Sequence, residues 1–332
     1  MAMYGLRTRH PVTGAVLSDP TTGLTRVVGS VYVSANSAGF LDVPAFSSGT
    51  PFAVGYAGGV PNIGSSQTYP VHSISGTRLS WNSAPLPTTI VYGVYAGNTS
   101  GKTGAGAAAV RFYNQNFATQ IDSFYVNHCV LTSGALNIPA NGSFAITIAA
   151  TSPLVAYRGT YLVTVLQQVK NGNGTWTLTI GAGPYGAVGT YYIFDVVSAS
   201  SQMFATPVGL RIRNPANNAV VFDSRMKYMR VVQIGDNAAD GGVPANLYTT
   251  ALNRDGLAAI VDPGLWFNET TRESEDQNGN PIFTDVYSPY FVGAGVNGTT
   301  LTEGSVSVGS ESPVIPGNSQ TGQTILVDVT NY

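Results

Sequence analysis

The sequence predicts an all-β protein, and three observations lead to that prediction. Its apolar segments are short, rich in Val, Ile, Tyr and Phe, and bounded by Gly, Pro, Asn or Ser. Several of them alternate polar with apolar residues, as strands with one buried face do. No window offers three turns of helical spacing without a Gly or Pro nearby. The expected strands include residues 27–33, 89–95, 144–148, 161–166, 176–180, 191–197 and 324–329.

The segments between these strands carry turn chemistry. Asn-Gly pairs occur at 171–172, 173–174, 278–279 and 297–298. Both residue types tolerate positive φ, so these pairs are suited to tight hairpins. The best helical candidate, residues 104–110, is an Ala/Gly run that is too short to form a helix alone.

An internal repeat is the strongest signal in the sequence. Residues 5–28 read GLRTRHPVTGAVLSDPTTGLTRVV, and residues 209–232 read GLRIRNPANNAVVFDSRMKYMRVV. Aligned without a gap, at an offset of 204, they share eleven identities in 24 positions. These include the pairs Asp19/Asp223 and Arg26/Arg230. So many identities are far beyond chance and predict that the two regions fold alike.

A fainter third copy lies in the middle of the chain. Asp122 lies 103 residues after Asp19 and 101 before Asp223, and it follows Arg111 and precedes Val130. The segment LDVPA at 41–45 matches LNIPA at 136–140 and, more loosely, IVDPG at 260–264. Gly-Thr recurs at 76, 174 and 298. We therefore expect three tandem β-sandwich-like modules, at residues 1–99, 100–203 and 204–332. The expected junctions are 97–109 and 198–206, and the third module's extra length is assigned to loops at 236–242, 269–280 and 304–322.

Composition excludes several classes of protein. The chain has 332 residues, of which only 10% are charged, and a net charge of −2, which argues against a nucleic-acid binder. A 43% apolar content argues against disorder, and apolar runs of around eight residues are too short to cross a membrane. The first residues show no apolar signal-peptide stretch, so synthesis and folding in a cytoplasm are expected. The single cysteine, Cys129, excludes an internal disulfide framework and a multi-cysteine zinc site.

Two segments have the composition of ligand-binding loops. Residues 96–103 (AGNTSGKT) satisfy the spacing of a phosphate-binding loop, but Gly104-Ala105-Gly106 is poorly suited to the helix that must follow. The segment also falls at a predicted junction, so a linker is the favoured interpretation. The acidic segment 269–280 contains Glu269, Glu273, Glu275 and Asp276, but its spacing fits no calcium loop. A solvated hairpin tip is expected there.

The histidines and the cysteine give no clear catalytic pattern. His10, His72 and His128 lie far apart in the sequence and in unlike contexts. His128 and Cys129 are adjacent, and adjacent strand residues point to opposite faces, so a packed cysteine is favoured over a Cys–His nucleophile pair. The Gly-x-Ser-x-Gly signature of many hydrolases is also missing. No catalytic residue, cofactor or metal is therefore assigned.

Other residues recur or are spread across the modules, and each has two interpretations. Arg7, Arg9 and Arg26 could form a patch for an anionic glycan. The alternative, favoured because fold-defining residues must recur in every copy, is that Asp19/Asp223 cap turns and Arg26/Arg230 pair locally.

One tryptophan falls in each module, and a core or inter-module anchor is favoured over a sugar-stacking platform. These are Trp81, Trp176 and Trp266.

Five segments of the chain carry a resemblance to a known family. They are Tyr4-Gly5-Leu6-Arg7, the turn from Ala15-Val16 to Asp19, Arg26-Val27-Val28-Gly29, Gly76-Thr77-Arg78-Leu79-Ser80-Trp81 and the ending ILVDVTNY at 325–332. Together they resemble small tail-associated proteins of long-tailed bacteriophages and prophages. The resemblance covers the first and third modules and implies a non-enzymatic virion component at the tail tip or fibre, acting in assembly and host attachment. It implies no catalytic residue.

That family implies other tail proteins as partners and a location on the virion tail, with a host-surface glycan or protein as a further partner. No nucleic acid and no membrane insertion are expected. Two alternatives stay open: another virion or cell-surface β protein, such as a capsid decoration or adhesin, and a glycan depolymerase using Glu269, Glu273 and Asp276. The three modules could surround a pseudo-threefold axis in one chain, or form an extended string within a homotrimer.

Overall fold

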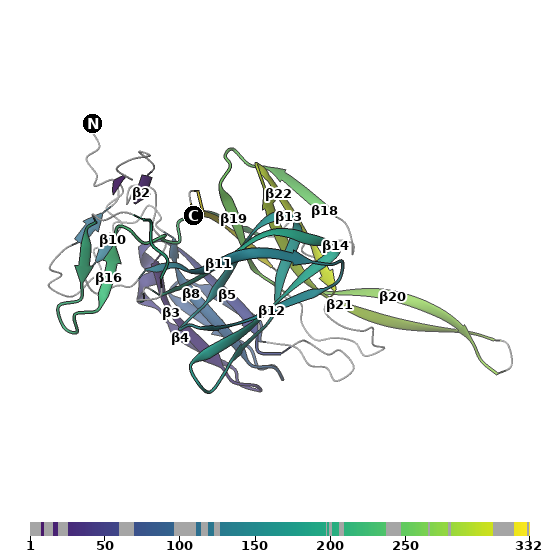
Figure 1. The fold of residues 1–332 in the computed structure, drawn as a ribbon. Coiled ribbons are helices and arrows are strands. Elements are labelled where there is room, and N and C mark those ends of the chain that lie inside the picture. Colours follow the sequence, from purple (N-terminus) through teal and green to yellow (C-terminus); the bar gives the residue numbers. More distant parts are fainter. Residues whose placement is uncertain are drawn as a thin grey trace.

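The chain folds almost entirely into β-strands, as a computed structural model shows (Figure 1). The sequence-based prediction of an all-β fold is confirmed. The helical content of the described residues includes one short 3-10 helix, η2 (Pro44–Ser48). The structure describes residues 8–9, 16–18, 26–59, 70–95, 111–113, 119–122, 127–196, 198, 201–205, 209–236, 247–264, 266–277, 280–307, 322–330 and 332.

The first segment of the chain forms two three-stranded antiparallel sheets. One sheet has the order β3-β8-β5 and the other the order β4-β7-β6. The two pack face to face around Leu79, Ile90 and Phe46, which are all buried. The strands are β3 (Arg26–Val33), β4 (Gly39–Asp42), β5 (Thr50–Ala57), β6 (His72–Ser75), β7 (Arg78–Trp81) and β8 (Thr88–Tyr95).

The middle segment has two long strands, β13 and β14, each of which pairs with three other strands. The last part of β14 lies between β11 and the first part of β13, and its first part lies between β12 and the last part of β13. The strands bend between these parts: Tyr161 has a left-handed φ of 56°, and Gly159 is paired with Gly189 across the ladder. The bounds are β11 (His128–Ile138), β12 (Ser143–Ala149), β13 (Leu154–Lys170) and β14 (Thr175–Val196).

The third segment again has two runs of three strands, ordered β17-β23-β19 and β18-β22-β21. A long hairpin, β20–β21, extends beyond the second run and projects from the body (Figure 1). The strands are β17 (Val231–Asp236), β18 (Leu247–Ala251), β19 (Leu257–Asp262), β20 (Trp266–Glu275), β21 (Pro281–Asn297), β22 (Thr300–Ser307) and β23 (Gln323–Asp328).

A short hairpin precedes each of these three segments. Each hairpin contains an irregularity in register, and in the first and third it separates equivalent residues, Thr8/Arg9 and Ile212/Arg213. The three hairpins lie near one another at one end of the molecule (Figure 1). They are β1–β2 (Thr8–Arg9 and Val16–Ser18), β9–β10 (Arg111–Tyr113 and Thr119–Asp122) and β15–β16 (Arg211–Arg213 and Val220–Asp223).

The order of strand pairing thus recurs three times along the chain. Further local details recur with it. The first strand of each segment shifts register immediately after Val27, Val130 or Val231. A glycine with positive φ lies in the turn before β7, before β14 and before β22, at Gly76, Gly174 and Gly298 respectively. A bulge and a left-handed turn at matching places indicate matched backbone paths.

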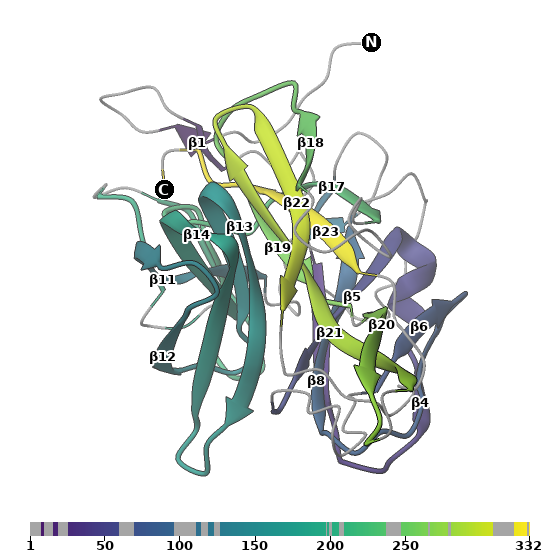
Figure 2. The same cartoon turned by 90° about the vertical axis from the view of Figure 1, so that its right-hand side faces the viewer.

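The three segments share one hydrophobic core. The third strand of the first segment, β5, contacts both β13 and β19, and β13 pairs with β19 at Ala156 and Ile260. Figure 2 shows the strands of the segments as three neighbouring groups. The core collects residues at matching ladder positions from each segment, namely Val27, Val130 and Val231, then Val54, Ala156 and Ile260, and then Val91, Tyr192 and Ile325.

The structure also differs from the sequence-based expectations. Residues 176–180 and 191–196 were expected to be two strands, but they are the two ends of one strand, β14. Residues 269–275 and 304–307 were expected to lie in loops, but they belong to the strands β20 and β22. Because β13 pairs with β19 and β21, the second and third segments share one sheet across the boundary placed at 203/204. The division into three separate modules therefore stays a prediction. The helical candidate at 104–110 lies outside the described residues.

Candidate functional site

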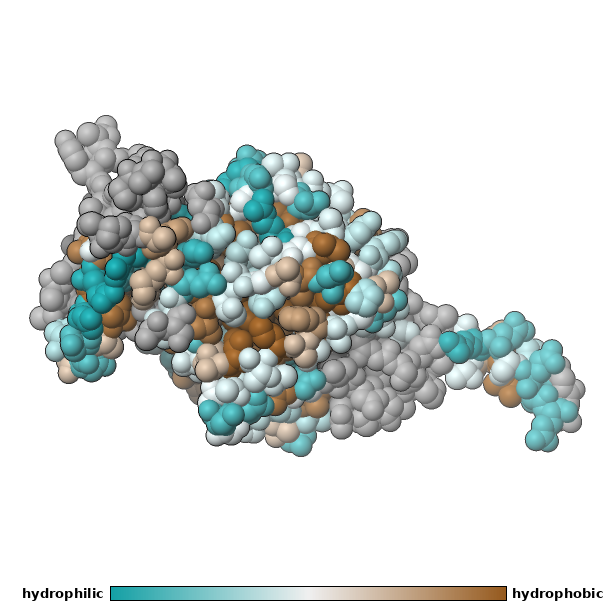
Figure 3. Space-filling model, viewed as in Figure 1, coloured by the Kyte–Doolittle hydropathy of each residue, from teal (hydrophilic) through white to brown (hydrophobic). Residues whose placement is uncertain are grey.

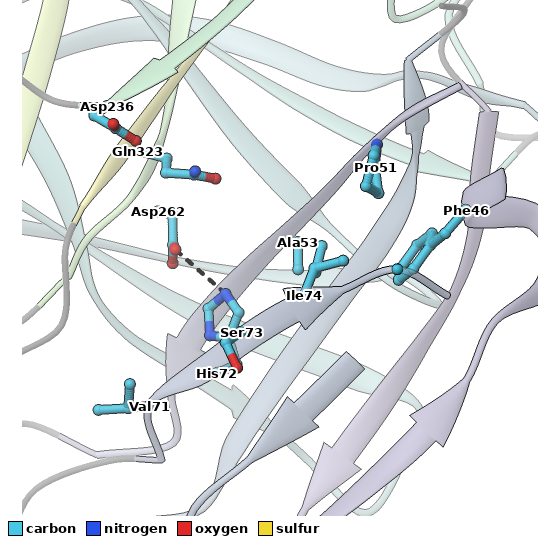
Figure 4. A pocket seen from close by; sticks show the side chains of 11 residues that line it. Phe46, Pro51, Ala53, Val71, His72, Ser73, Ile74, Asp236, Asp262 and Gln323 are labelled. Atoms are coloured by element: carbon cyan, nitrogen blue, oxygen red, sulfur yellow. Dashed lines mark ion pairs between the residues drawn. The ribbon is translucent and has the colours of Figure 1, made fainter. Parts of the chain in front are cut away.

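The first and third segments enclose a cavity of about 810 Å³ (Figure 4). Its apolar wall comes from the first segment and includes Phe46, Pro51 and Ile74. The opposite wall holds Asp236, Asp262 and Gln323, which stand at matching ends of the neighbouring strands β17, β19 and β23. His72, the first residue of β6, also lines the cavity. Among the described residues that line this cavity, the titratable side chains come from two distant parts of the chain: His72 from the first segment, and Asp236 and Asp262 from the third.

His72 and Asp262 are in direct contact inside this cavity. The Nε2 atom of His72 lies 3.3 Å from Oδ2 of Asp262, and both side chains are at least 95% buried. The other carboxylate oxygen, Oδ1, accepts a hydrogen bond of 3.0 Å from the backbone N–H of Gly55. Asp262 therefore connects β19 with both β5 and β6.

The surroundings of His72 favour its charged form. Burial by itself lowers the pKa of His72, but the charge of Asp262 and hydrogen bonds to Asp262 and to the Ala53 backbone outweigh burial and raise it. A protonated His72 beside the buried Asp262 carboxylate forms an ion pair. A charged side chain is tolerated in a protein interior only when it is paired in this way. The pair thus acts as a buried polar contact between the first and third segments, beside the hydrogen bond from the Gly55 N–H to Asp262.

A second buried polar contact lies on the neighbouring strands. The Thr324 hydroxyl donates a hydrogen bond of 2.7 Å to Oε1 of Glu303, joining β23 to β22. Glu303 and Thr324 are both buried. The third segment therefore carries two buried carboxylates, Asp262, which contacts the first segment, and Glu303, which contacts Thr324 of its own segment. Among the described residues, no three His, Cys, Asp or Glu side chains are grouped as metal ligands would be.

Sequence reasoning did not bring His72 and Asp262 together. His72 was one of three scattered histidines, and Asp262 was only part of a loose match to the segment 41–45. One local signal was present: Asp262 ends an otherwise apolar strand, LAAIVD, all of which is buried. A carboxylate in that position needs a partner, but only the fold shows which one.

The adjacent residues His128 and Cys129 are packed, not paired. His128 is fully buried, and its Nε2 lies 2.9 Å from the carbonyl oxygen of Ser152. Burial lowers the pKa of His128 and raises the pKa of the Cys129 thiol to about 12. Cys129 belongs to a separate cluster that includes Phe222 and Tyr228. At neutral pH the thiol is protonated, which does not suit a nucleophile.

The recurring aspartate makes local contacts where the structure describes it, and the recurring arginine makes a long-range one. Asp223 accepts hydrogen bonds from Arg211 and Arg225, and its carboxylate also accepts the backbone N–H of Arg225 in a turn. Arg230 lies 3.4 Å from Asp328. The contacts of Asp223 agree with its interpretation as a turn cap, whereas Arg230 pairs with Asp328, a residue distant in the sequence, so this contact is not the local pairing that was expected. The side chains of Arg7, Arg9, Asp19 and Arg26 lie outside the described residues.

The remaining candidates are spread over the molecule. Trp176 is buried in the shared core and donates from Nε1 to the carbonyl of Ala150, and Trp81 packs against the first segment's core. The acidic residues Glu273 and Glu275 lie on the exposed part of the hairpin β20–β21. His10, the loop 96–103 and the side chains of Trp266 and Glu269 lie outside the described residues.

The comparisons with known proteins add no relative. No protein-family model, curated protein or solved structure matches the chain. In the described part of the chain, no helix is both long and apolar enough to cross a membrane.

Proposed function

We propose that this chain is a non-enzymatic structural component of the tail tip or tail fibre of a long-tailed bacteriophage. The observation that carries the proposal is the triple recurrence of one strand order around a shared core. A chain built mostly from three similar units is rigid and presents several surfaces for binding. An enzyme with one active site gains little from such triplication. The likeness of residues 4–7, 15–19, 26–29, 76–81 and 325–332 to tail-associated proteins supports the same function.

The cavity supports an architectural role for its polar residues. The Asp262 carboxylate uses one oxygen on His72 and the other on Gly55. Both contacts join the first segment to the third, so the pair holds distant parts of the chain in one position. A structural particle that must survive outside a cell gains from such cross-links between its sheets.

The three similar hairpins are the feature of this chain that suits a threefold-symmetric position on a phage tail. Each segment contributes one hairpin to the same end of the molecule (Figure 1). A single chain with three similar surfaces matches a partner with threefold symmetry, since each partner subunit then meets an equivalent surface. We expect other tail proteins to be the binding partners.

Immunogold electron microscopy of intact particles tests this function. Antibody against this chain is applied to particles from a lysate of the host, with particles from a strain lacking the gene as the control. Gold at the distal tail supports the proposal. Gold on the heads would assign the chain to capsid decoration, and particles without gold would remove the virion assignment altogether.

A further inference from the structure

The hairpin β20–β21 ends in an exposed arm, of which the structure describes residues 271–277 and 280–284. The two strands pair in register from Trp266/Tyr290 to Glu275/Pro281, and the described residues of the arm are exposed apart from Asp276, which is half-buried. Phe283 is 65% exposed and Ile282 is 45% exposed. An isolated two-stranded hairpin is only marginally stable in water, and an aromatic side chain so far from the body buries little of its surface. These features are typical of an interaction surface.

One face of the arm is acidic around an aromatic residue. Glu273 lies directly opposite Phe283 in the ladder, and Glu275, two positions further, lies on the same face. Across residues 266–285 the chain has five acidic residues and one basic residue. An exposed aromatic ring flanked by carboxylates calls for a partner surface that is basic and partly apolar.

The hairpin β15–β16 provides such a surface on the same chain. Arg211 and Arg213 are exposed on one face of β15, while Ile212 between them is buried. Arg225 lies beside them through its contacts with Asp223, and Leu210 is 39% exposed. Residues 209–230 hold five basic residues and one acidic residue, the mirror image of the arm. We call residues 209–225 the basic end.

The arm and the basic end cannot meet within one molecule. Figure 1 shows β20 and β16 at opposite ends of the structure, and Figure 3 shows hydrophilic surface at both ends with an apolar spot on the arm. A protein with only 10% charged residues has concentrated opposite charges at two distant ends. Such a pattern suits contact between molecules in a head-to-tail arrangement.

We propose that the arm of one chain binds the basic end of a second copy, with Phe283 as the apolar anchor and Glu273 and Glu275 facing Arg211 and Arg213. The contact is heterologous, so it joins copies into a ring or an open row. Since few residues take part, we expect a dissociation constant of about 1–100 μM that rises with salt. This self-association does not depend on the proposed tail function.

Charge exchange provides the test, measured by sedimentation velocity across concentration. The arm variant E273K/E275K leaves both surfaces basic, and the end variant R213E/A216E leaves both acidic, so each alone should associate at least about tenfold more weakly than the wild type. An equimolar mixture restores two attractive contacts. We expect it to associate within about threefold of the wild type.

Matched controls separate this contact from general effects. S143K/A145K adds two lysines to the exposed face of β12 and should leave association unchanged. F283S should weaken it, whereas Y32S, which removes another exposed aromatic side chain, should not. A wild-type chain that stays monomeric up to about 100 μM at low salt overturns the proposal. So does association that survives either charge variant, or a mixture that fails to restore it.

Discussion

His72 and Asp262 hold together two strands from distant parts of the chain. The Nε2 of His72 at the start of β6 lies 3.3 Å from the Asp262 carboxylate at the end of β19, and both side chains are buried. The same carboxylate accepts the Gly55 backbone N–H, so one side chain satisfies polar groups from two strands of the first segment. Removing the side chain of either His72 or Asp262 takes away one buried polar group and leaves the other without this contact.

Asp262→Ala should destabilise the protein by about 3 kcal/mol, because it takes the carboxylate away from both a buried imidazole and the Gly55 amide. Asp262→Asn keeps an oxygen that can accept from Gly55 and should cost less. Equilibrium unfolding in urea measures both losses. If Ala and Asn cost the same small amount, below about 0.5 kcal/mol, the contact does not stabilise the fold.

The same pair predicts a dependence of stability on pH. Asp262 raises the pKa of His72 above its ordinary value of 6.5, although burial opposes that rise. A raised pKa in the folded state contributes stability that is complete below pH 6.5 and is lost as the pH rises through the folded value. The contribution of His72 should therefore be largest in mild acid and should fade toward alkaline pH.

This pH dependence must be separated from that of His128. Burial lowers the pKa of His128, so its effect has the opposite sign and destabilises the fold below pH 6.5. The measurement is thus the difference in unfolding free energy between the wild type and His72→Gln between about pH 5 and 9. A difference that grows as the pH rises would contradict the assigned direction. His128→Gln, measured in the same way, gives the reference of opposite sign.

The sequence allowed much of the fold to be predicted, because strands and turns are encoded locally. Residues 27–33 and 89–95 lie within observed strands, and the turn at Asn297-Gly298 joins β21 to β22. The long strand β14 was divided in two, since its middle, around Gly181–Gly189, is rich in glycine and reads as a loop. Its extended form depends on the neighbouring strands β11, β12 and β13, which no local pattern reveals.

The candidate site could not be predicted in the same way. His72 and Asp262 come from strands of different sheets, and their contact depends on how the first and third segments pack. The exposed arm was anticipated only as a hairpin tip, because adjacent strand residues such as Arg272 and Glu273, which point to opposite faces, are both polar. Polar residues on both faces read as loop when the alternation that marks a buried face is missing.

Gly295 should not tolerate a side chain. It lies in β21, and a Cβ atom placed there would collide with the backbone carbonyl oxygen of Tyr161 on β13. The neighbouring backbone is constrained, since Tyr161 already has a left-handed φ of 56°. Gly295→Ala should cost about 2–3 kcal/mol, measured by urea unfolding.

Gly235 in β17 gives the matched control for that substitution. A Cβ atom at Gly235 would meet no atom within 4 Å, so Gly235→Ala should change stability by less than about 0.5 kcal/mol. Equal effects at the two positions would mean that the close approach of β21 to β13 does not occur in solution.

Asp223 should make the protein sensitive to acid. Burial alone would raise its pKa, but hydrogen bonds from Arg225 and Arg211 outweigh burial and lower the pKa from 3.8 to about 2. A lowered pKa contributes stability that is present above pH 3.8 and is lost as the pH falls toward 2, here about 2 kcal/mol. Asp223→Asn should remove that contribution at neutral pH and flatten the acid limb of the stability curve.

Asp42 pairs with Arg78 in the same way but is exposed, so Asp42→Asn should leave the curve almost unchanged because solvent screens the pair. If Asp42→Asn destabilises the protein as much as Asp223→Asn, burial of Asp223 is not what makes its pairing stabilising.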